Sequence, residues 1–207
     1  NIDKTKYKSL FTQNTNEVFC LGGSNIAPYY IHHSAKDVYL SQHVIDTLSR
    51  SNLQGECRLV MQRITGVGAQ KRFITALLSG DNFMCVNSVN YILESELKLP
   101  AKFILALLNS KLLTYYDNLT DTNANITAEV IGSLPIAKTC PVETQKIITL
   151  VDSILAAKKA NPLADTIAEE REIDHLVYHL YDLTYDEVLI VDPETPITRE
   201  QYESFES

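Results

Sequence analysis

The hydrophobic pattern of this chain changes its period at Pro100. Before that point, residues 57–65, 72–78 and 82–93 are rich in β-branched and aromatic residues, and the segments Gly66-Val67-Gly68 and 79–82 separate them. Short runs of this kind, bounded by glycine-containing turns, are typical of strands joined by hairpins. This part of the sequence therefore predicts a small, twisted, mostly antiparallel sheet.

Beyond Pro100 the apolar residues recur at helical spacing. The intervals are four, four, three and four residues along the stripe Ile104, Leu108, Leu112, Tyr115 and Leu119. One apolar stripe results, because residues three and four apart share a helix face. Asn109-Ser110 interrupts it with a residue suited to cap a helix, so we expect one helix to end there and a second to begin.

The C-terminal third has a second helical pattern. An apolar stripe at 147, 148, 151, 154 and 155 predicts a helix that Asn161-Pro162 ends. Capping boxes at Thr166–Glu169 and Thr184–Glu187 predict two further helix starts. Residues 120–142 predict a long loop that closes on an extended piece at 134–136.

These patterns predict an α/β (α+β) fold: a twisted, mostly antiparallel sheet with packed helices, followed by a helical C-terminal subdomain. We place the first domain at residues 1–142, a helical docking subdomain at 143–191 and a polar tail at 192–207. Residues 1–55 are expected to form short strands and loops.

The charge is distributed unevenly between these parts. The formal net charge is −8 over 207 residues, but residues 1–140 carry 13 basic and 11 acidic side chains, whereas 141–207 carry 5 and 15. The acidic total therefore does not exclude a polyanionic partner for the first two-thirds of the chain.

Several classes of protein are disfavoured. No run reaches the roughly 18 apolar residues of a membrane span, and the N-terminus lacks an apolar signal core. The four cysteines form no Cys-x-x-Cys pair, which indicates thiols in a reducing compartment. We expect a cytoplasmic protein without membrane contact. The chain starts without Met, as a piece of a larger polypeptide would.

Two stretches resemble a known family. Residues 59–66, 71–76, 87–93 and 107–113 resemble the TaqI-like C-terminal specificity domain, and residues 173–188 are similar to the segment that follows this domain in type IIG restriction-modification enzymes and related adenine-specific DNA methyltransferases. With 134–136 also in its expected place, the resemblance covers about 56–191. It implies a target-recognition domain that reads double-stranded DNA for a methyltransferase domain of the same polypeptide.

The catalytic half of such an enzyme is not recognisable in this chain. Methyltransferases of this type use an Asn-Pro-Pro-Tyr-like tetrapeptide to hold the flipped base, and the only Asn-Pro here continues as Leu163-Ala164. No glycine-rich loop for S-adenosylmethionine stands out. We therefore expect no catalytic residues and no cofactor here, with S-adenosylmethionine bound by the catalytic domain of a parent that methylates adenine, with or without cleaving DNA.

The candidate DNA-binding residues lie in the basic middle of the chain. Residues 50–111 hold eight basic and four acidic side chains. Arg pairs naturally with guanine and Asn or Gln with adenine, while cations contact phosphates. The predicted contacts are Gln62, Arg63, Lys71, Arg72, Asn87, Asn90 and Lys111, with Asn123 and Asn125 as further candidates.

Two other functions remain open from the sequence. Asp81, Glu96 and Lys98 resemble the Asp…Glu-x-Lys arrangement of Mg²⁺-dependent nucleases, although 94–98 reads as an exposed connection. A protein–protein interaction module is the other alternative, because the acidic helices would repel DNA.

Two further motifs resemble a metal site and a phosphate-binding loop only weakly. His175 and His179 share a helix face, as metal ligands must, but a third ligand is not apparent, so helix packing is the preferred interpretation and no metal is predicted. The segment 66–71 lacks the Ser or Thr of a phosphate-binding loop, and a hairpin loop suits it better.

Overall fold

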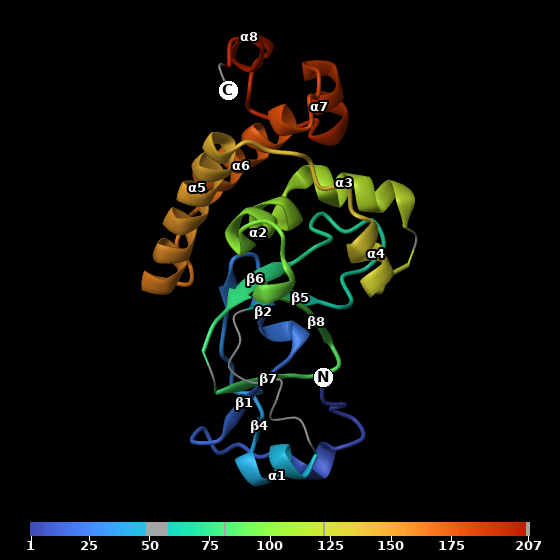
Figure 1. Ribbon diagram of the computed structural model, residues 1–207, viewed down its shortest axis with the longest axis vertical. Coiled ribbons are helices and arrows are strands. Elements are labelled where there is room, and N and C mark those ends of the chain that lie inside the picture. Colours follow the sequence, from blue (N-terminus) through green and yellow to red (C-terminus); the bar gives the residue numbers. More distant parts are fainter. Residues whose placement is uncertain (49–57, 81, 122, 206–207) are drawn as a thin grey trace.

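A computed structural model describes residues 1–48, 58–80, 82–121 and 123–205. Its elements stack along the long axis of the molecule (Figure 1): an N-terminal sheet with α1 at one end, a central sheet, and the helices α2–α8 at the other end. The chain thus has the predicted mixed α/β architecture with a helical C-terminal region.

The central sheet is antiparallel, as the run-and-turn pattern predicted. Its strand order is β6-β5-β8, with β5 at Arg58–Gln62, β6 at Thr75–Leu78 and β8 at Val89–Leu93. On β5, Val60 is opposite Ala76 of β6 and Tyr91 of β8. Leu59, Val60 and Met61 are fully buried, which fits a strand that is central in its sheet.

The run at 82–93 proves to be two strands in different sheets. β7, Phe83–Cys85, pairs in parallel with β1, Val18–Leu21, and β4, Tyr39–Leu40, completes a sheet of order β4-β1-β7. The chain turns at 86–88 before β8. Only Asn87 and Ser88 are polar in this turn, and the apolar residues on either side, Val86 and Val89, are both buried, so the hydrophobic pattern alone did not mark the change of sheet.

Smaller elements complete the N-terminal half. They are η1 at Lys8–Leu10, η2 at Gly23–Asn25, the two-stranded pair β2 at Ile26–Ala27 and β3 at Tyr30–Ile31, α1 at Gln42–Thr47, and η4 at Glu94–Glu96.

The predicted break at Asn109-Ser110 is confirmed. α2 runs over Ala101–Asn109 and α3 over Lys111–Thr120, and the Ser110 hydroxyl accepts a hydrogen bond from the Leu113 amide at 3.3 Å. α2 is buried along most of its length between the central sheet and α5. The stripe does not stay in the core beyond the break, however, because α3 takes a new direction and leaves Leu119 67% exposed.

The remaining helices are α4 at Ala128–Ser133, α5 at Pro141–Ala160, α6 at Ile167–Leu180, α7 at Tyr185–Val191 and α8 at Arg199–Glu203. The capping box at Thr184 forms as predicted. The box at Thr166 does not, because Thr166 lacks the extended backbone that a cap requires and its hydroxyl donates to Glu170 instead.

The predicted loop and the predicted tail both contain a short helix. α4 interrupts the 120–142 loop, with the Thr127 hydroxyl as its N-cap. The prediction of a polar tail at 192–207 was wrong in the described part of this segment. There α8 begins at a capping box of Thr198 and Gln201, and Tyr202 is buried to 4% exposure. Tyr202 also donates to the carbonyl of Leu183 at 2.7 Å, which ties α8 back to the segment before α7.

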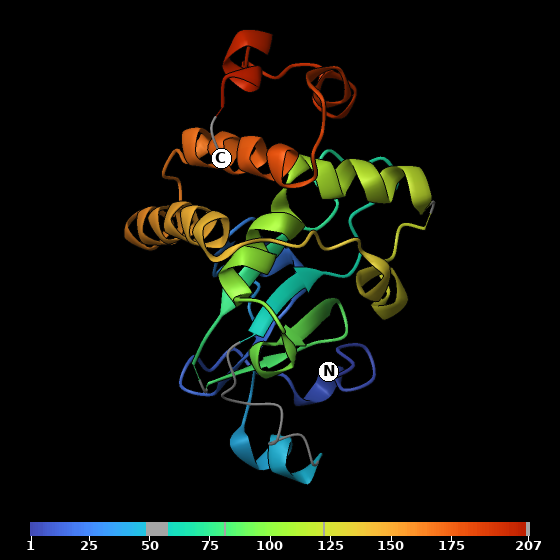
Figure 2. The same cartoon turned by 45° about the horizontal axis from the view of Figure 1, so that its top comes forward.

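One hydrophobic core crosses the predicted boundary at 142/143. Ile147, Val151 and Ile154 of α5 belong to the same buried cluster as Leu59 of β5 and Phe103 of α2. Figure 2 shows α5 lying alongside α2. The C-terminal helix α5 therefore packs on α2, and α2 in turn packs on the central sheet, so the three form one body.

Asn109, the last residue of α2, is hydrogen-bonded to the first residue of β6 in the central sheet. Its side-chain amide accepts from the Thr75 amide at 3.1 Å and donates to the Thr75 carbonyl at 3.0 Å, and all of these groups are buried. We expect Asn109→Ala to lower the free energy of unfolding by about 1–3 kcal/mol, since the buried Thr75 amide loses its acceptor, whereas the Thr75 carbonyl keeps the Tyr29 amide as a donor.

Urea unfolding followed by circular dichroism measures this effect. Asn16→Ala, in an exposed turn, is the matched control and should change stability by less than about 0.5 kcal/mol. Equal effects of the two substitutions would contradict the role given to Asn109.

Candidate nucleic-acid interface

Four predicted contacts gather where β5 and β8 meet at one end of the central sheet. Gln62 ends β5 opposite Val89, and the exposed Arg63 donates from Nη1 to the carbonyl of Asn87 at 3.3 Å. The side-chain amides of Gln62 and Asn90 donate inward, to the carbonyls of Ile26 at 2.8 Å and Ile126 at 2.6 Å. Arg63 is therefore exposed, whereas the side chains of Gln62 and Asn90 are held inward, and Asn87 is half-buried.

A distant segment extends this end of the sheet. The Ile126 amide donates to the Arg63 carbonyl at 2.8 Å, the Thr65 amide donates to the Ala124 carbonyl at 3.3 Å, and Ile64 forms an isolated bridge with Asn125. This pairing brings Asn123 and Asn125 beside Arg63. We call the surface formed by Arg63, Ile64, Val67, Asn87, Asn123 and Asn125 the sheet rim.

The loop between β5 and β6 supplies the apolar part of the sheet rim. Ile64 is 60% exposed and Val67 is 62% exposed. Val67 lies between Gly66 and Gly68, whose φ angles of +91° and +67° suit glycine and strain other residues. The Asn118 side chain donates to the Ala69 carbonyl at 3.0 Å, so the loop is held against α3 while its tip projects.

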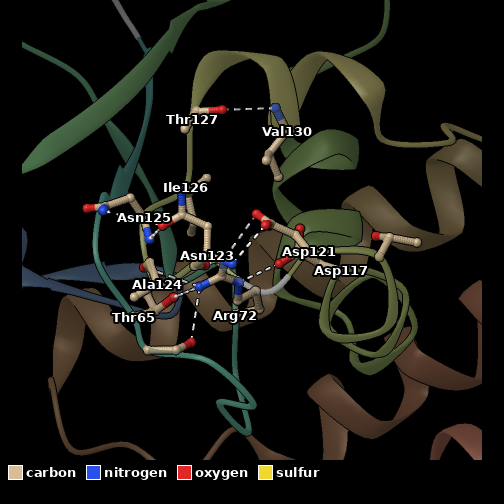
Figure 3. A network of polar contacts seen from close by, with 12 residues as sticks. Thr65, Arg72, Asp117, Asp121, Asn123, Ala124, Asn125, Ile126, Thr127 and Val130 are labelled. Carbon is tan, nitrogen blue, oxygen red and sulfur yellow. Dashed lines mark hydrogen bonds and ion pairs between the residues drawn. The ribbon is translucent and has the colours of Figure 1, made fainter.

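Arg72 was predicted to contact DNA, but its side chain is 1% exposed and lies inside the protein (Figure 3). Its Nε pairs with Asp117, its Nη1 donates to the Gly66 carbonyl at 3.0 Å, and its Nη2 donates to the Asn123 carbonyl. Weaker contacts reach Thr65, Ala124 and Asp121. The prediction for Arg72 was wrong because these partners, 45–52 positions away or across the loop, consume its donors.

The two remaining predicted contacts, Lys71 and Lys111, line a cavity of about 200 Å³. Lys71 pairs with Glu170 of α6 and Lys111 with Asp192 after α7, each at 2.6 Å. Gln70, Tyr29 and Asp174 line the same cavity. The predicted contacts thus fall into three groups. Some lie at the end of the central sheet where β5 and β8 meet, some line this cavity, and Arg72 is buried between the two.

Asp174 sits against the start of α3. Its Oδ1 accepts from the Lys111 amide at 2.9 Å. Burial raises the pKa of Asp174 from 3.8 to about 6, against the opposing effects of that hydrogen bond and of the neighbouring lysines. No sequence signal pointed to Glu170 or Asp174, since they lie 99 or more residues from Lys71 in the chain.

Comparison with known proteins identifies the family. A model of the TaqI-like C-terminal specificity domain matches residues 18–136, which is more than half of the chain and includes the sheet rim. The chain belongs to the TaqI-like specificity domain family. The resemblance to this family that the sequence indicated is confirmed.

A solved structure has a similar fold to this specificity domain. It is the type IIL restriction-modification enzyme MmeI in complex with DNA, with a TM-score of 0.58, 14% sequence identity, and a match over 99% of this chain and 34% of that one. The chain therefore spans about a third of the length of that enzyme. No curated protein sequence gives a significant match.

Two of the three residues considered for a nuclease, Glu96 and Lys98, are described by the structure, and neither is buried. Glu96 ends the 3-10 turn η4 and is exposed, as is Lys98. Both lie in the exposed connection that the sequence indicated, and Asp81 lies outside the described residues.

His175 and His179 take part in packing. Their Nε2 atoms are 3.0 Å apart, and His179 stacks on Tyr202 and Phe205 with ring centroids 4.0 and 4.6 Å away. Burial lowers the pKa of both histidines. Within the described ranges, no group of three His, Cys, Asp or Glu residues is arranged to hold a metal ion, and no helix is long and apolar enough to cross a membrane.

Arg72 allows a direct test of the buried ion pair. We expect Arg72→Met to lower the free energy of unfolding by about 3–5 kcal/mol, because it leaves Asp117, 2% exposed, without its cation. Adding Asp117→Asn to this variant should recover part of the loss. The neighbouring Lys71→Met, which breaks a half-exposed pair, is the matched control and should cost less than about 1 kcal/mol.

Chemical denaturation of Arg72→Met, Asp117→Asn and the double variant measures the coupling between Arg72 and Asp117. Additive effects of the two substitutions would show that the pair contributes nothing beyond its separate members, contrary to the network described above.

Asp174 predicts a pH dependence of stability. Its folded-state pKa lies above its ordinary value, so its contribution is fully present below pH 3.8 and is lost as the pH rises through about 6. Asp174→Asn keeps an acceptor for the Lys111 amide and removes the buried charge. We expect the variant to be more stable than the original chain at pH 7.5 by on the order of 1–2 kcal/mol, with the difference vanishing near pH 4.

Thermal unfolding between pH 4 and pH 8 measures this difference. Asp182→Asn is the control, because Asp182 is exposed and its left-handed backbone, φ +54°, tolerates Asn. A difference between Asp174→Asn and the original chain that does not vary with pH would contradict the raised pKa.

Proposed function

We propose that this chain is the sequence-specific double-stranded DNA recognition domain of a type II restriction-modification enzyme, or of a site-specific N6-adenine DNA methyltransferase, and that it directs a catalytic domain of the same polypeptide to its target. The observation that carries the proposal is the family match over residues 18–136, which spans the sheet rim. S-adenosylmethionine would be bound by the catalytic domain of this cytoplasmic enzyme.

The chemistry of the sheet rim suits base recognition. Arg63 uses one N–H to hold the Asn87 carbonyl, and its other guanidinium donors have no partner among the described residues. A guanidinium with free parallel N–H groups can pair with the O6 and N7 acceptors of guanine, and an Asn side chain can pair with adenine. Ile64 and Val67 offer apolar contact to a thymine methyl group.

The sheet rim is rigid enough to discriminate between bases. Backbone pairing joins 63–65 to 124–126, and the buried Arg72 holds the Gly66 and Asn123 carbonyls beneath them. Binding groups fixed before binding lose little conformational entropy on contact. Specificity would therefore come from the fixed relative positions of Arg63 and the Asn side chains.

The helices at 143–191 suit a protein neighbour better than DNA. Residues 141–207 carry 15 acidic and 5 basic side chains, so like charge would repel phosphates. Leu163, in the turn between α5 and α6, is 90% exposed, and Ile167 is 54% exposed. We infer that this part docks the recognition domain on the catalytic domain.

The salt dependence of binding tests the proposal. Fluorescence anisotropy with labelled duplex DNA at 20 to 200 mM KCl should show an affinity that falls steeply with salt, because phosphate contacts release counterions. A flat response would exclude DNA recognition and favour the protein-interaction alternative, in which exposed residues such as Leu163 carry the function.

A single substitution tests the assignment of the sheet rim. Arg63→Ala should weaken binding to the cognate duplex by on the order of tenfold, and Arg63→Lys should restore charge without restoring sequence preference. Lys159→Ala removes an equal charge from an exposed position at the end of α5 and should change affinity less than about twofold. Equal losses for Arg63→Ala and Lys159→Ala would contradict the assignment.

A further inference from the structure

The cavity beside Lys71 is lined by the hydroxyl of a buried tyrosine, Tyr29. Tyr29 lies in the turn between β2 and β3, is 4% exposed and lines the cavity. Its φ of +62° is unusual for a bulky residue, and its amide donates to the Thr75 carbonyl at 2.9 Å, which fixes this conformation. Its hydroxyl makes no hydrogen bond to the described residues and is not among their fully enclosed side-chain atoms without a partner. The hydroxyl is therefore open to the cavity and available to a ligand.

The carboxylate of Asp174 has unused acceptor capacity in the same cavity. Its Oδ1 accepts from the Lys111 amide, and its Oδ2 has no hydrogen-bond partner in the described part of the chain. The cavity therefore offers one donor or acceptor at Tyr29 and a free acceptor at Asp174.

Cationic groups surround these two atoms. Lys71 and Lys111 each have a carboxylate partner but remain 39% and 42% exposed, and the exposed Arg171 has no partner among the described residues. The lining holds three cationic and two anionic side chains. Ile167 and Ile173 provide apolar surface between them.

These features select among ligands by size and charge. A volume of about 200 Å³ is below the range typical of sites for drug-sized ligands, so it suits a single ring system. A cationic ligand would meet three cations, and an anion alone would approach the free oxygen of Asp174. A nucleobase is neutral, its ring faces suit apolar surface, and its edge carries both donors and acceptors.

We propose that this cavity binds one nucleotide, with an amino-bearing base (adenine, cytosine or guanine) inserted toward Tyr29 and Asp174 and with its phosphate against Lys71, Lys111 or Arg171. The exocyclic amino group donates to Asp174 and the Tyr29 hydroxyl bonds a ring acceptor. One source of the nucleotide is DNA with one unstacked base, and this part of the proposal rests on the proposed function. The binding of a free nucleotide by the cavity does not depend on that function.

Nuclear magnetic resonance titration of the 207-residue chain tests the proposal with the four deoxynucleoside monophosphates. We expect saturable shifts of the Tyr29, Asn109 and Lys111 signals, with at least one amino-bearing nucleotide binding fivefold or more tightly than thymidine monophosphate. Tyr29→Phe removes only the hydroxyl and should weaken that binding by about fivefold. Asp174→Asn, which exchanges the acceptor for an amide, should remove the preference over thymidine monophosphate.

Three results would overturn the proposal. The first is that inorganic phosphate alone reproduces the full set of shifts, which would leave the base without a role. The blocked amino acid N-acetyl-arginine-methylamide, in place of the nucleotides, could occupy the cavity, which would assign it to a protein partner. Unchanged nucleotide binding in Tyr29→Phe would also overturn it.

Two further measurements distinguish binding in the cavity from binding at the sheet rim, and DNA from free nucleotide as the ligand of the cavity. Single-stranded DNA of random sequence should compete with the bound monophosphate if the cavity takes a base from DNA; failure to compete would overturn DNA as the source. Arg63→Ala should weaken duplex binding and leave monophosphate binding unchanged. Monophosphate binding without any duplex binding would refute DNA recognition while supporting the cavity.

Discussion

The buried guanidinium of Arg72 is the constraint on which the candidate interface depends. Taking an arginine out of water is costly unless its donors find partners. Here two carboxylates, Asp117 and Asp121, supply the charge, and backbone carbonyls of two loops complete the coordination (Figure 3). Neither loop could move away without leaving N–H groups of the buried guanidinium without acceptors, so these hydrogen bonds fix the relative position of the two loops.

The same residue connects the sheet rim to the cavity. The side chain of Arg72 holds the carbonyls of Gly66 and Asn123 below the sheet rim, and its backbone amide donates to the Thr114 hydroxyl, which lines the cavity. Lys71, the preceding residue, reaches across the cavity to Glu170. The adjacent cations Lys71 and Arg72 thus have opposite surroundings. Arg72 is buried and holds two loops together, whereas Lys71 is half-exposed and lines the cavity.

Local chemistry explains which sequence predictions agree with the structure. The break between α2 and α3 was predictable because Ser110 caps the helix that follows it, within three residues. The division of 82–93 into β7 and β8 was not, because both strands are apolar and only their partners differ. The helix α8 was missed although Thr198 and Gln201 form a capping box, since the surrounding residues are polar and Tyr202 is its single buried residue.

The sequence by itself determined the class of the fold, the helix break and the resemblance to specificity domains, because strand and helix periods, caps and ordered motifs are properties of neighbouring residues. It also predicted that basic and amide side chains of the middle segment are the candidates for DNA contact. Tertiary structure alone decided which of them are available. Arg72 is buried and Arg63 exposed because residues near 117–124 fold over one and leave the other free, and contacts between residues 45 or more positions apart leave no periodic trace in the chain.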